Sequence, residues 1–217
     1  CSSDLLLNDP SYNEDTSISK LLYWSEAQEE RRKKLMPFLW NVLANKGQLL
    51  GNREYGNNFN IANSYGISYP GYNEMLTGNT DQQVSSNKKR WNNNLNVLEY
   101  LNGQDGFNEK IAVFTSWNVF PYILNTRRNG LKANCGIDSS NTSLLSEKQA
   151  LLQHTIMEAG EESATREDRL TFTAAKYYLK KELPRVLFIG LGEADEFAHD
   201  GKYDMYLDRL ANYDRML

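Results

Sequence analysis

The sequence predicts an α/β fold, a layered sandwich in which helices flank a mainly parallel sheet. Two apolar segments, KIAVFTSW at 110–117 and RVLFIGLG at 185–192, have the continuous apolar character of buried parallel strands. Segments with helical spacing precede, separate and follow them, and this alternation is typical of layered α/β proteins. With 217 residues, the chain is long enough to bury a core between its layers.

The first third of the chain is predicted to hold two helices between loops. Residues 1–14 are polar and read as a loop, whereas 19–35 has helical spacing and an RRKK run expected on an exposed face. A second helix is predicted over 37–47, since its leading proline and closing glycine suit the two ends of a helix. The segment 47–68 is rich in Gly, Asn and Tyr, so we expect a loop with short strands.

Five more helices are predicted downstream. They cover 70–78, 92–103, 144–160, 168–184 and 201–217. The first four end at a glycine or a proline, which are the residues that stop helices most often. Because ligands bind at the carboxyl ends of strands in such folds, we expect a site where the second strand ends.

Composition and charge exclude some classes of function. The formal net charge is −4, which argues against nucleic acid as a partner because phosphate backbones select clustered Lys and Arg. No apolar run approaches the roughly 18 residues of a membrane span. The two cysteines, Cys1 and Cys135, are too few for a disulfide framework, although CSSD at the start also resembles the processed end of a lipoprotein.

The segment DEFAH follows the second predicted strand and is a candidate metal site. Asp195 and His199 are four residues apart, so on a helical turn both side chains lie on one face. A carboxylate and an imidazole in this arrangement can share one divalent metal ion, most plausibly zinc. The alternative is a helix-capping aspartate beside an unrelated surface histidine.

The segment SYPGYNEMLTG offers a candidate nucleophile. Ser68 stands two residues before Pro70, which places it in the cap region of a predicted helix. The N–H groups and the dipole at a helix start favour an anion such as a phosphate or an alkoxide. A serine needs a base or a metal for activation, and no histidine is close in sequence, so metal activation is expected. The alternative is that Ser68 only caps the helix.

Together these residues resemble the alkaline phosphatase superfamily. One similarity to the nucleophile segment of this superfamily, as found in the nucleotide pyrophosphatase/phosphodiesterase branch, is the segment SYPGYNEMLTG. A second similarity, to a later segment that binds zinc in the family, is GLGEADEFAHDGKYDMYLDRLANYD. LMPFLW, NVLEYLN and AVFTSWNVFP resemble bacterial proteins labelled alkaline phosphatase-type phosphoglyceromutase. The resemblance implies a metal-dependent phosphoester hydrolase or phosphotransferase, with a small phosphoester as substrate. It also implies a periplasmic or cell-surface location, because such relatives are usually exported.

The resemblance assigns roles to particular residues. Ser68 would be the nucleophile and a ligand of one of two divalent metal ions, and Asp195 and His199 would be ligands of the other, with zinc the expected metal. An asparagine after the nucleophile helix hydrogen-bonds the transferred phosphoryl group in related enzymes, which makes Asn92 and Asn94 candidate substrate contacts. Capping of the next helix is the alternative for these asparagines.

The sequence also departs from the family pattern. Family members carry an Asp-Gly strand end before the nucleophile, and an Asp-His-Gly motif and a distant histidine after the segment that ends here. We therefore expect 1–217 to be a partial alkaline phosphatase-like catalytic domain whose metal site is incomplete. One alternative is an inactive binding domain of the same fold. A sulfatase-like hydrolase is another, but its motif needs an arginine where Tyr72 stands.

Overall fold

The computed structural model describes residues 16–52, 55–137, 144–158 and 165–217, and the chain forms two units. One unit is Ile61–Gly192, and the other combines Cys1–Asn60 with Glu193–Leu217. The loop predicted over 1–14 lies outside the described residues. Within the described ranges, no helix is long and apolar enough to cross a membrane.

The unit Ile61–Gly192 is built on a three-stranded parallel sheet. Its strands are β1 (Ile111–Thr115), β2 (Lys132–Cys135) and β3 (Val186–Gly190), in the order β2-β1-β3. In the register of the sheet, Val113 lies opposite Ala133 on one side and Phe188 on the other. The two predicted strands and their parallel arrangement are thus confirmed. The sequence analysis missed β2, because its four residues include a lysine and an asparagine and give no apolar run.

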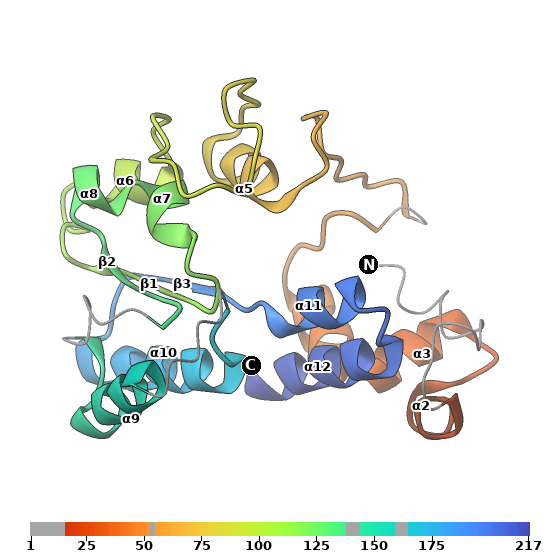
Figure 1. The fold of residues 1–217 in the computed structure, drawn as a ribbon. Coiled ribbons are helices and arrows are strands. Elements are labelled where there is room, and N and C mark those ends of the chain that lie inside the picture. The colour runs from red at the N-terminus through yellow and green to blue at the C-terminus, as the bar shows by residue number, and fades with distance from the viewer. Residues whose placement is uncertain (1–15, 53–54, 138–143, 159–164) are drawn as a thin grey trace. The chain divides into compact units, whose positions relative to one another are not determined.

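Helices cover both faces of this sheet, as the prediction of a layered fold requires (Figure 1). Alternate residues of β1 point to opposite faces, so Ile111 and Val113 belong to one apolar cluster and Ala112 and Phe114 to another. The first face carries α5 (Ser68–Thr77), α6 (Val97–Asn102), α7 (Phe120–Leu124) and α8 (Thr126–Asn129). The second face carries α9 (Glu147–Glu158) and α10 (Asp168–Glu182).

The other unit is helical within its described residues. It contains α2 (Thr16–Tyr23), α3 (Gln28–Leu35), the π-helical turn η2 (Leu39–Leu43), α4 (Ala44–Lys46), α11 (Glu193–His199) and α12 (Tyr203–Met216). The carboxylate of Asp214 accepts the N–H groups of Phe38 and Leu39 at 2.8 and 2.7 Å, which joins the two parts of this unit. Tyr23, Leu35 and Leu207 lie in its core.

Three details of the amino-terminal part differ from the sequence prediction. The helix predicted over 19–35 is broken between α2 and α3, because the Arg31 side chain donates to the carbonyls of Ser25 and Glu26 and supplies partners for the break. Arg31 is consequently buried, with its guanidinium 4.1 Å from the Trp24 ring, and the RRKK run is not wholly exposed. The short strands expected within 47–68 are absent from the described part of that segment.

Candidate functional site

Ser68 is the first residue of α5, as the sequence predicted. The residue that precedes the helix is Ile67, which offers no side-chain cap, and Pro70 occupies the third helical position, not the first. Ser68 is partly exposed, whereas Tyr69 and Pro70 beside it are buried. Among the described residues, the Ser68 hydroxyl makes no hydrogen bond, so the predicted alternative of a capping serine does not describe its role.

The start of α5 has few free donors for an anion. The Tyr69 N–H donates to the Asn87 side-chain oxygen at 2.9 Å, and Gly71 N–H bonds the Ile67 carbonyl at 3.2 Å. Pro70 has no N–H to offer. An anion at this helix start would therefore rely on the Ser68 N–H and hydroxyl. Displacing Asn87 would free one further donor.

The side chain beside Ser68 does not supply a base. Burial raises the pKa of Tyr69 to about 12, so its phenol stays protonated at neutral pH. Its hydroxyl lies 2.7 Å from the Arg90 carbonyl and 3.0 Å from the Tyr122 carbonyl, and it serves to hold the loop after α5. Tyr69 therefore cannot take a proton from the Ser68 hydroxyl at neutral pH.

Asn92 and Asn94 lie in a cluster of polar side chains behind α5. Both amides donate to the side-chain oxygen of Asn73, at 2.9 and 3.0 Å, and the Asn94 amide also donates to Asp81 at 2.8 Å. Asn94 holds the pKa of Asp81 below its ordinary value through this bond. These contacts tie the loop to the helix. Both N–H groups of the Asn94 amide are engaged, and Asn92 is buried, so neither amide is open to a substrate in this structure. Asn96, in contrast, caps α6 by accepting the Glu99 N–H, which is the alternative role considered for these asparagines.

Asp195 and His199 lie on α11, and their side chains meet as predicted. His199 Nε2 is 3.5 Å from Asp195 Oδ2, and the two side chains are 79% and 69% exposed. A catalytic zinc usually has three protein ligands, and the described ranges contain no group of three His, Cys, Asp or Glu side chains that could hold a metal ion. The described residues therefore do not complete a zinc site. Ser68 belongs to the unit Ile61–Gly192, whereas Asp195 and His199 belong to the unit that includes Glu193–Leu217.

The structure contains a buried network that the sequence analysis did not identify. Its members are Ser116, Asn134, Gln153, Arg166, Asp168 and Thr171, all buried near the carboxyl ends of β1 and β2. Ser116 donates to Asp168, which also accepts the Gly192 N–H at 2.8 Å. The only feature of the sequence that could have indicated this network is a serine directly after an apolar strand. The Arg-Glu-Asp segment that contacts this serine is distant in the sequence and has no recognisable pattern.

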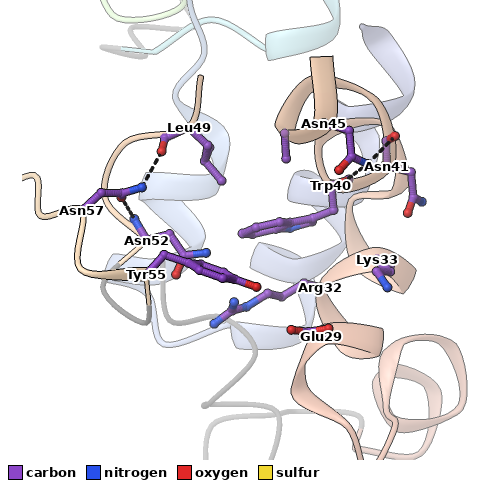
Figure 2. Close-up of a pocket in the computed structure, with 11 residues that line it drawn as sticks. Glu29, Arg32, Lys33, Trp40, Asn41, Asn45, Leu49, Asn52, Tyr55 and Asn57 are labelled. Carbon is purple, nitrogen blue, oxygen red and sulfur yellow. Dashed lines mark hydrogen bonds between the residues drawn. The ribbon is translucent and has the colours of Figure 1, made fainter. Parts of the chain in front are cut away.

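A cavity in the unit that combines Cys1–Asn60 with Glu193–Leu217 contains none of the predicted site residues. Its volume is about 500 Å³, and its walls come from α3, η2, α4 and the loop after them. Figure 2 shows Trp40 and Tyr55 pointing toward one another, with Arg32 beside them. The Asn57 amide donates to the Leu49 carbonyl at 2.9 Å and shapes the loop that forms one wall.

Comparisons of the chain with protein-family models, with curated proteins and with solved structures find no match.

Proposed function

We propose that this chain carries the nucleophile of a phosphoester hydrolase or phosphotransferase of the alkaline phosphatase type. The observation that carries the proposal is the position of Ser68, at the start of a ten-residue helix in an α/β unit, partly exposed and with its hydroxyl uncommitted. The resemblance of the SYPGYNEMLTG segment to a nucleophile segment supports the same role. The layered alkaline phosphatase-like sandwich is part of this proposal, and the small parallel sheet is consistent with it.

The proposed step is a displacement at phosphorus. The Ser68 oxygen forms a bond to phosphorus as the bond to the leaving alcohol breaks, and the alcohol oxygen takes up a proton. Water, or a second hydroxyl in a transferase, then cleaves the phosphoserine. The N–H of Ser68 and the dipole of α5 favour the phosphoryl group at this position. Two zinc ions are the proposed cofactors. Asp195 and His199 would be two of the ligands of one ion.

The test is a search for the covalent intermediate. Protein expressed from the complete gene is mixed with an aryl phosphate and zinc, quenched in acid, and digested for mass spectrometry. We expect one phosphoryl group on the Ser68 peptide, and Ser68→Ala should lower turnover by about 10³-fold or more, as loss of a serine nucleophile does elsewhere. Ser64→Ala is the matched control, because Ser64 is an exposed serine four residues earlier. Near-normal turnover in Ser68→Ala would refute the proposal.

The second candidate is a binding function, and the cavity in Figure 2 favours it. Two aromatic rings, Trp40 and Tyr55, border a space that also exposes Asn41, Asn52 and Glu29. Such a mixture suits a polar ligand with one apolar face, for example a saccharide ring, since the aromatic rings offer flat apolar area and the amides, with Arg32 and Lys33, offer hydrogen bonds. Titration of neutral saccharides with tryptophan fluorescence as the readout tests it. Binding that survives both Trp40→Ala and Tyr55→Ala would contradict this assignment.

A further inference from the structure

The second face of the sheet contains a small apolar cavity between α9 and α10. Its volume is about 190 Å³. At the roughly 30 Å³ that each water molecule occupies in the liquid, this is room for about six waters, and so for a ligand of similar bulk. Leucines, isoleucines and an alanine form most of its walls: Ile137, Leu145, Leu152, Ile156, Leu170 and Ala174. An apolar cavity of this kind favours an apolar occupant over water.

Two polar side chains of the buried network also line this cavity. They are Arg166, which is 4% exposed, and Gln153, which is 5% exposed. Burial lowers the pKa of Arg166 to about 10, so the guanidinium still carries its charge at neutral pH. The apolar cavity therefore has a fixed positive charge in its wall.

Arg166 is held by neutral oxygen atoms. Its guanidinium donates to the side chains of Asn134, Thr171 and Gln153 at 2.6, 3.1 and 3.3 Å, and to the Thr115 carbonyl at 3.4 Å. The Asp168 carboxylate bonds Ser116 and the Gly192 N–H, and its charge acts on Arg166 without a direct hydrogen bond among the bonds named above. A guanidinium has five N–H donors, and among the described residues these four bonds leave one, on Nη2. Burial disfavours the charge of Arg166 more than the nearby Cys135 and Asp168 favour it, and an anion in the cavity would reduce the remaining cost of the buried charge.

We propose that this cavity binds a small monocarboxylate with an apolar body. The carboxylate faces Arg166, which pairs well with planar anions, and the apolar body lies against Leu152, Ile156 and the other apolar walls. Lys148, exposed at the rim, adds a second positive charge. A cation would be repelled by both charges, and inorganic phosphate would leave the apolar walls uncovered. This site is independent of Ser68 and of phosphoester chemistry.

Hexanoate is a suitable probe, because its six carbons and one carboxylate match the size and the polarity of the cavity. It is titrated into the full chain and followed by NMR chemical shifts, with hexanol, hexylamine and inorganic phosphate as comparison ligands. We expect saturable binding of hexanoate and binding at least about tenfold weaker for each of the other three, since only hexanoate satisfies both the charge and the apolar walls.

Two neighbouring leucines of α9 give a matched pair of variants. Leu152 is 45% exposed and lines the cavity, whereas Leu151 is 69% exposed and does not. Leu152→Glu places a negative charge beside the bound carboxylate and should weaken hexanoate binding by about tenfold or more. Leu151→Glu adds the same charge one residue away and should leave the affinity within about twofold. Both positions are exposed, so both variants should remain folded.

Each outcome of this experiment decides the proposal. Selective hexanoate binding that Leu152→Glu weakens and Leu151→Glu does not would support it. Absence of hexanoate binding at millimolar concentration would overturn it. Equal binding of hexanoate and hexanol would also overturn it, because the charge of Arg166 would then have no role. An equal loss in both glutamate variants would refute the location between α9 and α10.

Discussion

The buried network near β1 and the exposed pair on α11 are built from similar side chains but differ in their access to water. Asp168 is buried and bonded by Ser116 and the Gly192 N–H, whereas Asp195 is 69% exposed beside His199. A buried carboxylate is committed to the donors that replaced its water, because losing them costs the full desolvation of the group. An exposed carboxylate exchanges partners freely. The first arrangement therefore stabilises the fold, and the second remains available for a ligand.

Among the substitutions that test this comparison, loss of the Asp168 carboxylate should have the largest effect on the free energy of unfolding. Asp168→Ala removes the acceptor of the Gly192 N–H, leaves the Ser116 hydroxyl with Thr171 as its remaining partner, and takes away a negative charge that favours the buried Arg166, which should lower the free energy of unfolding by about 3 kcal/mol. Asp195→Ala is the control, and as an exposed substitution it should change stability by no more than about 0.5 kcal/mol. Urea unfolding followed by circular dichroism measures both. Equal losses in the two variants would show that exposure does not separate these carboxylates.

A buried cluster of uncharged amide side chains should show a loss of stability between those of the buried and the exposed carboxylate. Asn73 is buried on α5, and its side-chain oxygen accepts both the Asn92 and the Asn94 amide. Asn73→Ala should cost about 1–3 kcal/mol of unfolding free energy, because a buried amide of Asn92 loses its acceptor. Asn58→Ala is a control, since Asn58 is exposed. A loss as small as that of the control would mean that the loop after α5 is not held by these amides.

Zinc binding tests the exposed pair directly. Two pre-placed ligands should capture zinc weakly, and since a catalytic zinc usually has three protein ligands, the chain should show no tight site. His199→Ala should remove the weak binding at α11 and leave any weak binding by the similar pair of His154 and Glu158. Calorimetric titration of residues 1–217 gives the stoichiometry and the affinity. His154→Ala is the matched control, because His154 also stands four residues from a carboxylate, Glu158, on an exposed helix face. Two tight sites per chain would contradict the incomplete metal set inferred here.

The smallest expected effect on stability concerns Glu74, a partly exposed carboxylate that lies between the buried Asp168 and the exposed Asp195 in its access to water. Hydrogen bonds from the Ala62 N–H, the Asn63 side chain and the Asn63 N–H lower the pKa of Glu74. A depressed pKa in the folded state means that its contribution is present above the ordinary value of 4.5 and is lost as the pH falls below it.

Glu74→Gln should therefore lower the free energy of unfolding modestly at neutral pH and change it little at acid pH, which flattens the acid side of the stability profile. Urea unfolding at a series of pH values between neutral and acid measures this profile. An unchanged acid dependence in Glu74→Gln would mean that these three hydrogen bonds persist when Glu74 is protonated.

Much of the fold was predictable because its signals are local. The apolar runs that become β1 and β3, the closing glycine of α5 and the helical spacing of α10 and α12 all lie within short windows of sequence. The same holds for the four-residue spacing of Asp195 and His199, which fixes their shared face on α11. Ser68 was placed at a helix start for the same local reason. The sequence by itself determined these elements and the candidate residues on them.

The tertiary structure alone decided which polar residues are buried and what they touch. Asn134 and Arg166 meet across 32 residues, and Ser116 and Asp168 across 52, with no spacing in the sequence that marks either pair. The short strand β2 exists because β1 supplies its hydrogen-bond partners, not because its own composition is typical of a strand. Asn92 and Asn94 have amides engaged by Asn73 for the same reason. Burial and long-range contact depend on the packing of distant segments, and a local pattern does not contain that information.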